Sequence, residues 1–408
     1  MEYQTYTLSN NIQLIHKSVE STVAHCCVMV DAGSRDEEKN ELGLAHFIEH
    51  VIFKGTKKRN FSSILNRLEG VGADLNAYTT KEQTCVYASF LNKYYSRTLE
   101  LFQDVFFNSI FPEEELKKEK DIIIDEIASY KDSPAEQIFE DFEDLIFHGH
   151  PIGRNILGTP KNVKKLNRNN IIDFIDKNYK NNKIIICSVG KIEFKKLIFL
   201  VEKYFGDLPQ TYGDNKRKKF LDYKPVNKSI IKRNHQSHCI IGNIAYSIKD
   251  DRRIPLALLN NILGGISLNS RLNIGLREKH GIAYNIESDY IAYSDTGFFS
   301  VYLGTKPDLL EKSIELVYKE FDKLKEKKLG TLQLRNAKQQ FIGQLAISND
   351  SNLNKTLTAA KSFLVNKKVY SLSEISDIIN AVTSEQLLDI ANEIFDKDKL
   401  STLIYKVR

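Results

Sequence analysis

Several kinds of segment are missing from this chain of 408 residues. No apolar run approaches the ~20 residues of a membrane-spanning helix, so we expect no membrane association. The opening stretch MEYQTYTLSN has neither the basic and apolar regions of a signal peptide nor the arginines of a transit peptide. The excess of basic over acidic residues, 58 against 53, is too small to suggest nucleic acid as a partner.

Cysteine is scarce, and its pattern excludes a disulfide framework and a zinc knuckle. The chain has an odd number of cysteines and no C-x-x-C pair, and all of them lie in strand-like stretches: Cys26, Cys27, Cys85, Cys187 and Cys239. Buried thiols of this kind indicate a reducing compartment, and we expect a cytoplasmic location.

The chain contains one pattern twice. The stretches LNAYTTKEQTCVYASFL and YIAYSDTGFFSVYLGTK align without a gap. Ala77 pairs with Ala292 and Tyr87 with Tyr302, at a constant offset of 215 (292 − 77 and 302 − 87). Such a repeat predicts two similar structural units.

Each half reads as alternating strands followed by long amphipathic helices. We therefore expect an α+β fold of two homologous domains, each an α/β layer with a sheet and helices packed on it. A polar stretch with glycine and proline lies between the halves. It places the domains at 1–210 and 228–408 and a linker at 211–227.

The stretch GLAHFIEHVIFKGT, residues 43–56, carries two histidines and a glutamate in an apolar run. Its spacing predicts a helix that ends near Gly55, on which His46 and His50 project from one face. Two imidazoles so placed can reach one zinc ion at about 2 Å, and Glu49 can approach the open position as a general base. H-x-x-E-H is the inverted form of a zinc peptidase motif. A surface helix that merely carries these groups is the alternative.

The repeat argues against that alternative. Shifted by 215 residues, the three polar positions correspond to Asn261, Gly264 and Gly265. A fold that needed the polar groups for packing would need them in both copies. We infer that they serve chemistry and that the second domain is metal-free.

A second helix is predicted in FPEEELKKEKDIIIDEIASYKDSP, beginning at Pro112. Its inward stripe contains Leu116, Glu119, Ile123, Glu126, Ile127 and Tyr130. A carboxylate buried without a partner costs several kcal/mol, so two on one buried stripe imply a cation opposite. An ordinary charged helix with a wide polar face is the alternative.

These stretches, with LNAYTTKEQTCVYA, HPIGRNILGT and LREKHGIAYNI, resemble the pitrilysin/insulinase superfamily of metallopeptidases. The resemblance covers nearly the whole chain and is greatest to the short-chain bacterial branch related to mitochondrial processing peptidases. It implies an insulinase-like fold, one zinc ion per chain and a zinc-dependent endopeptidase. Glu126, 80 residues after His46 (126 − 46), matches the family's third ligand. Glu119 matches a residue that braces a ligand histidine.

Other site residues follow from the resemblance alone. Arg277 and Tyr284 match a pair that holds the substrate backbone and stabilises the oxyanion. The stretch DLNAYTTKE resembles an edge strand that receives the peptide, which makes Asn76, Ala77 and Tyr78 candidate substrate contacts.

The sequence also suggests an oligomeric state, and it leaves more than one function open. Only LGGISLNSRL stands where heterodimeric processing enzymes carry a long glycine-rich loop, and this chain carries both halves of the active site. We therefore expect a homodimer in which each Arg/Tyr pair serves its partner's zinc and which cuts short or unfolded peptides. A catalytically inactive structural or partner subunit is the first alternative. A metal-binding protein without hydrolase activity is the second, and it would not need Glu49.

Overall fold

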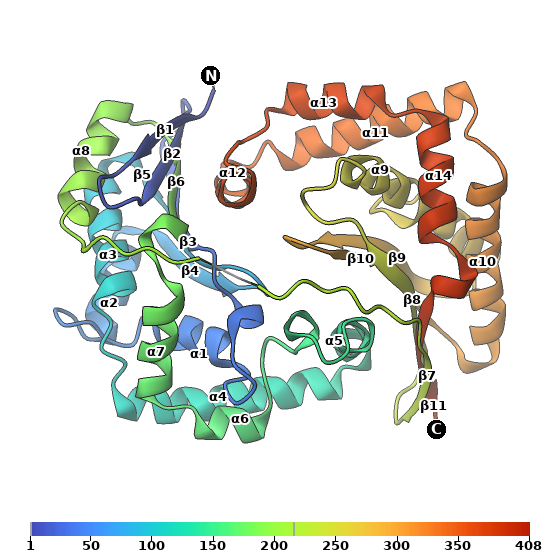
Figure 1. Cartoon of the computed structure of the whole chain (residues 1–408), viewed down its shortest axis with the longest axis horizontal. Coiled ribbons are helices and arrows are strands. Elements are labelled where there is room, and N and C mark those ends of the chain that lie inside the picture. Colours follow the sequence, from blue (N-terminus) through green and yellow to red (C-terminus); the bar gives the residue numbers. More distant parts are fainter. Residues whose placement is uncertain (1, 215–216) are drawn as a thin grey trace. The chain divides into compact units, whose positions relative to one another are not determined.

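The computed structural model describes residues 2–214 and 217–408, apart from the side chain of Tyr284. It forms two compact units, each built around its own sheet (Figure 1). Unit 1 comprises Met1–Ala128, Arg154–Arg217 and Ser348–Tyr370, and unit 2 comprises Ser129–Gly153, Lys218–Ile347 and Ser371–Arg408. Each unit thus combines segments from both halves of the sequence repeat. Residues 215–216 of the predicted linker lie outside the described residues.

The sheet of unit 1 has the strand order β1-β2-β6-β3-β5-β4. Its strands are β1 (Gln4–Thr7), β2 (Gln13–Ser18), β3 (Val23–Val30), β4 (Asp74–Thr79), β5 (Thr84–Leu91) and β6 (Ile184–Gly190). β2 and β6 run parallel, whereas the other neighbouring strands are antiparallel. β4 forms one edge of the sheet.

The sheet of unit 2 has the order β7-β11-β8-β10-β9. Its strands are β7 (Asn227–Lys232), β8 (Ser237–Ala245), β9 (Ala283–Ala292), β10 (Gly297–Thr305) and β11 (Ser401–Val407). β7 and β11 run parallel and the other pairs are antiparallel, as in β2-β6-β3-β5-β4 of unit 1. The two homologous layers predicted from the repeat are confirmed.

Helices cover both faces of the sheet in unit 1. They are α1 (Leu44–Val51), α2 (Phe61–Leu68), α3 (Tyr95–Phe107), α4 (Glu113–Asp132, with its last turn in unit 2), α6 (Pro160–Lys165), α7 (Arg168–Asn178), α8 (Phe194–Phe205) and α12 (Asn352–Asn366). Successive residues of β3 point to opposite faces. Val28 packs in the core with α1, α3 and α8, whereas Cys27 and Met29 pack against Ala359 and Ala360 of α12.

Unit 2 is covered in the same way. Its helices are α5 (Pro134–Ile146), α9 (Arg253–Gly264), α10 (Leu310–Glu326), α11 (Thr331–Ser348, with its last residue in unit 1), α13 (Leu372–Ala381) and α14 (Ser384–Ile394). Ile138 and Phe142 of α5 pack with Ile240 and Tyr405 on one face of the sheet. α9, α10 and α14 enclose the core on the other face.

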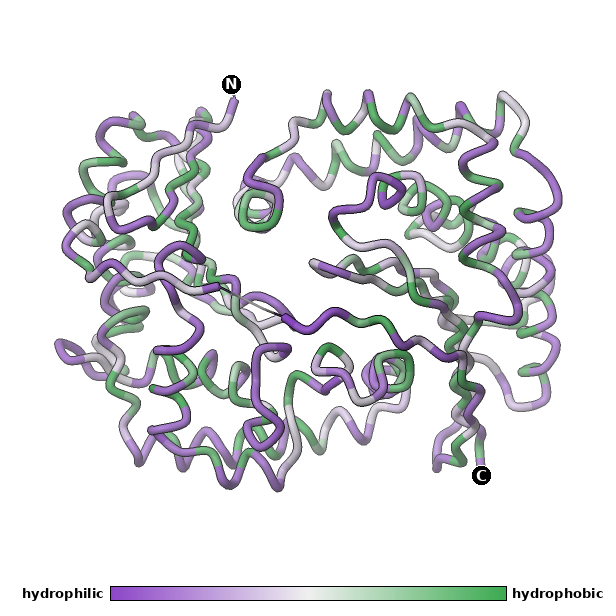
Figure 2. Tube along the Cα trace, in the orientation of Figure 1, coloured by the Kyte–Doolittle hydropathy of each residue, from purple (hydrophilic) through white to green (hydrophobic). Residues whose placement is uncertain are grey.

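The distribution of apolar residues agrees with this layering. The tube in Figure 2 alternates between hydrophobic and hydrophilic residues along helices such as α10 and α13, whose apolar sides pack inward. All five cysteines are buried and free. Among the described helices, none combines the length and apolarity that a membrane crossing requires.

Candidate metal centre

The helix that carries the two histidines is held at its N-terminal end. α1 begins at Leu44 and ends at Val51, earlier than the predicted end near Gly55. Glu37 caps it: Oε2 accepts a hydrogen bond from Gly43 N at 3.0 Å, and Oε1 accepts one from Ala45 N at 2.8 Å. These N–H groups have no partner within the helix. Burial, opposed by the two hydrogen bonds, raises the pKa of Glu37 to about 8.

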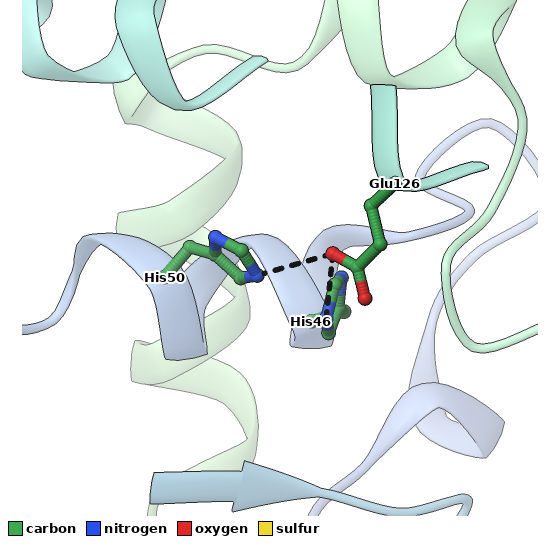
Figure 3. Close-up of side chains that lie close together, drawn as sticks. All are labelled: His46, His50 and Glu126. Atoms are coloured by element: carbon green, nitrogen blue, oxygen red, sulfur yellow. Dashed lines mark ion pairs between the residues drawn. The ribbon is translucent and has the colours of Figure 1, made fainter. Parts of the chain in front are cut away.

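Three side chains that are able to bind a metal converge at α1. The rings of His46 and His50 have centroids 4.6 Å apart. Glu126 reaches them from α4, with Oε2 at 3.5 Å from His50 Nε2 and 3.8 Å from His46 Nε2 (Figure 3). The three ligand atoms lie within 4.8 Å of one another, a grouping found nowhere else in the described part of the chain. The structure thus brings the three predicted ligands together.

The geometry and chemistry of this donor set fit a zinc ion. Two donor atoms about 2.05 Å from a tetrahedral ion lie about 3.3 Å apart, close to the separations between Glu126 and the two rings. Burial, with a smaller contribution from His50, lowers the pKa of His46 to about 3. The ring therefore stays neutral at physiological pH, which is the form that binds a metal.

Glu119 also contacts this cluster, through His50. Its Oε2 accepts a hydrogen bond from His50 Nδ1 at 3.1 Å, and its Oε1 lies 2.7 Å from Lys54 Nζ. Because His50 donates through Nδ1, the lone pair of Nε2 points toward Glu126. Burial acts to raise the pKa of Glu119, but the hydrogen bonds from His50 and Lys54 prevail and the pKa is lowered.

The stripe predicted for α4 is only partly inward-facing. Leu116, Glu119 and Ile123 are buried as predicted. The prediction was wrong for Tyr130, which is 39% exposed, and only partly right for Glu126, whose side chain is 33% exposed. The carboxylate of Glu126 is therefore partly open to solvent.

Glu49 lies on α1 between the two histidines in sequence. Burial raises its pKa, and hydrogen bonding to Thr79 opposes the shift. Thr79 is the last residue of β4, and its hydroxyl also donates to the carbonyl of Ala45 at 3.4 Å. These contacts tie α1 to β4, and α1 also contacts α7, which lies beside it in Figure 1. A carboxyl group with a raised pKa beside a metal centre is suited to accept and return a proton.

The strand predicted to receive substrate is an edge strand. β4 pairs with β5 on one side and has no neighbour on the other within the described sheet. Asn76 is exposed, Ala77 packs toward the helices, and the ring of Tyr78 lies 6.1 Å from that of Tyr87 on the opposite face. An edge strand offers unpaired backbone groups to an added strand.

Sequence comparison identifies the family. The profile described as Insulinase (Peptidase family M16) matches residues 13–160, and that described as Peptidase M16 inactive domain matches residues 165–341. This chain belongs to the insulinase family. It is 31% identical over 402 residues to the uncharacterized zinc protease YmxG of Bacillus subtilis, covering 98% of this chain and 97% of the relative. It is 28% identical over 411 residues to mitochondrial-processing peptidase subunit beta of Neurospora crassa, covering 97% and 86%.

Solved structures share the fold of this insulinase-family chain. The peptidase M16 inactive domain from Pseudomonas fluorescens has a TM-score of 0.92 at 20% identity and covers 100% of this chain and 98% of its own. A protease from Helicobacter pylori has a TM-score of 0.91 at 21% identity, with 99% of each chain covered. The family predicted from the sequence motifs is confirmed.

The second repeat of this chain has no room for a side chain at the position that corresponds to Glu49. Asn261 and Gly264 lie in α9, and Gly265 caps its end. A Cβ at Gly264 would lie 2.8 Å from the backbone nitrogen of Ser288. The position that corresponds to Glu49 is thus closed by packing, in the half matched by the inactive-domain profile.

The predicted arginine and tyrosine both belong to unit 2. Arg277 is exposed near the end of the π-helical turn η6 (Asn273–Glu278). Tyr284 lies in β9, and its side chain falls outside the described residues. Their action at the metal centre stays a prediction.

Sequence reasoning missed two residues that support the centre, Glu37 and Lys54. Glu37 caps a helix from which it is separated by a loop, so no local pattern points to it. Lys54 had a signal: it follows His46 and His50 at a spacing of four residues, and its Nζ lies 2.7 Å from Glu119 Oε1.

Proposed function

We propose that this chain is a zinc-dependent endopeptidase of the H-x-x-E-H type that hydrolyses peptides or unfolded polypeptides. In this proposal His46, His50 and Glu126 hold one zinc ion per chain. The main support is the convergence of their ligand atoms within 4.8 Å. Zinc is favoured because relatives at 31% and 30% identity are named zinc proteases.

The chain's own residues account for the proton transfers. A zinc ion held at this site supplies Lewis-acid activation of water and polarisation of the substrate carbonyl. Glu49 takes the proton of the attacking water and delivers it to the nitrogen of the leaving amine. Glu119 keeps His50 in the tautomer that presents Nε2. Arg277 holds the substrate backbone, and Tyr284 donates a hydrogen bond to the developing oxyanion.

The proposed substrate site is the free edge of β4. An extended peptide that pairs with this strand forms main-chain hydrogen bonds, which depend little on its sequence. Asn76, Ala77 and Tyr78 then contact the peptide. The ties from Thr79 to α1 support this placement, because they hold the edge strand beside the metal centre.

A homodimer in the cytoplasm is the proposed assembly and location. One chain carries the metal ligands in unit 1 and the Arg277/Tyr284 pair in unit 2, so two copies can complete each other's sites. Five buried free cysteines support a reducing compartment.

The proposal is tested with fluorogenic peptides and metal analysis on the wild type and Glu49→Gln. We expect both proteins to bind one zinc ion per chain and Glu49→Gln to lose ~10²- to 10⁴-fold in cleavage rate. Glu114→Gln, at an exposed position of α4, is the control and should cleave like the wild type. Zinc binding without cleavage by either protein would favour a catalytically inactive partner subunit.

A further inference from the structure

Lys54 follows α1 in the chain, and its side chain contacts Glu119 of α4 and the ring of Phe61 in α2. Its Nζ lies 2.7 Å from Glu119 Oε1 and 4.4 Å from the centroid of the Phe61 ring. The other oxygen of Glu119 accepts the hydrogen bond from His50 Nδ1 at 3.1 Å. One carboxyl group is therefore held at both oxygens, by the lysine and by a proposed metal ligand.

The ion pair between Lys54 and Glu119 lies where little solvent reaches it. The side chain of Glu119 is 6% exposed and that of Lys54 is 17% exposed. A carboxylate with so little solvent needs a compensating charge in the protein. The face of the Phe61 ring attracts the ammonium group and restricts where it can sit. Lys54 is thus a fixed countercharge for Glu119.

The direction in which His50 points depends on Glu119. A carboxylate pinned at Oε1 can present Oε2 to the imidazole in only a narrow range of orientations. With Nδ1 bound to that oxygen, Nε2 faces Glu126 Oε2 at 3.5 Å. Partners behind a metal ligand set its tautomer and its ring plane in this way.

We propose that Lys54 is a positioning residue of the metal centre: it holds Glu119 so that His50 presents Nε2 to the ion. The inference rests on the proposed function, because it takes His46, His50 and Glu126 as zinc ligands. It goes further by assigning a role to a residue that does not itself belong to the ligand set.

The test measures zinc affinity rather than turnover. Metal-free wild type, Lys54→Met and Lys54→Arg are titrated with zinc in competition with a chromophoric chelator. We expect Lys54→Met to bind zinc ~10- to 100-fold more weakly, the range for residues behind a ligand, and Lys54→Arg to recover most of the loss. Lys118→Met is the matched control, because Lys118 pairs with Glu115 at 2.6 Å on α4 with 64% of its side chain exposed. It should leave zinc affinity unchanged.

A double-variant cycle separates positioning from general stabilisation. If Lys54 acts through Glu119, adding Lys54→Met to Glu119→Gln causes little further loss of affinity. Wild-type affinity in Lys54→Met, or an equal loss in both backgrounds, would overturn the proposal. Should Lys54→Met not fold, Lys54→Gln and Lys54→Arg serve in the same cycle.

The outcomes also separate this inference from the proposed function. A wild type that binds zinc and cleaves no peptide contradicts the endopeptidase proposal, while the affinity cycle still decides the role of Lys54. A wild type that binds zinc and cleaves, with an unchanged Lys54→Met, contradicts only the role of Lys54.

Discussion

Gly43 lies so close to Leu157 that a Cβ on Gly43 would come within 2.6 Å of the Leu157 carbonyl oxygen. Gly43 also has a φ of 90°, which residues with a side chain rarely adopt. Arg154, in the same opposing segment, donates a hydrogen bond to the Glu37 carbonyl at 2.7 Å. The segment 154–157 therefore supports the start of α1, and so the position of the two histidines.

Replacing Gly43 tests this support. We expect Gly43→Ala to lower the free energy of unfolding by more than the ~1–2 kcal/mol of a positive φ alone, because the backbone at Leu157 must move. Zinc affinity should fall with it. Gly72→Ala is the control, since Gly72 has a φ of 75° and open space around a Cβ. Denaturant unfolding and zinc titration measure both effects. Equal losses in the two variants would mean that the contact with Leu157 is not rigid.

Removal of Glu126 tests the ligand set. The wild type should hold one zinc ion per chain by elemental analysis, because the corresponding positions in α9 lack ligating side chains. Glu126→Gln should weaken zinc binding by more than the ~10- to 100-fold expected for Lys54→Met, since it replaces a proposed ligand. Glu114→Gln on the same helix should retain full occupancy. Unchanged zinc affinity in Glu126→Gln would contradict the role of Glu126 as a ligand, and the two histidines alone would not complete a zinc site.

The pKa of His46 predicts an acid dependence of stability in the metal-free protein. Burial lowers this pKa to about 3 in the folded state, against 6.5 for an ordinary histidine. Between these two values the unfolded chain binds one more proton, so folded stability falls as pH falls below 6.5. Urea unfolding at several pH values should show a smaller loss on acidification in His46→Gln than in the wild type. Identical losses would show that His46 is protonated in the folded protein.

Mixing inactive variants tests the homodimer. Arg277→Ala and Glu49→Gln should each be nearly inactive alone. In a mixed dimer, the Arg277→Ala protomer keeps Glu49 and receives Arg277 from its partner, so partial activity should return on mixing in a peptide assay. Glu49→Gln mixed with the Glu49→Gln/Arg277→Ala double variant is the control and should stay inactive. No recovery would indicate that each site is completed within one chain.

Some strands escaped sequence analysis for an identifiable reason. β1, β2 and β7 were not predicted, and the first residue of β7, Asn227, falls within the predicted linker. β7 is exposed or half-exposed along its length, so it shows no apolar pattern. The position of β7 in the sheet is set by its parallel pairing with β11, the last strand of the chain, which no local pattern in the sequence reveals. The central strands β3 and β6 were evident because both of their faces are largely buried and most of their residues are apolar.

The sequence by itself determined that His46 and His50 share one face of a helix, because residues four apart meet through local backbone geometry alone. It also determined the repeat and the family. Only the tertiary structure decided that Glu126 reaches the two rings and that Lys54 and Glu37 support them. The packing of α12 on the sheet of unit 1 was likewise decided only by the tertiary structure. These contacts join segments far apart in the chain, and packing rather than helical or strand period sets the distance between them.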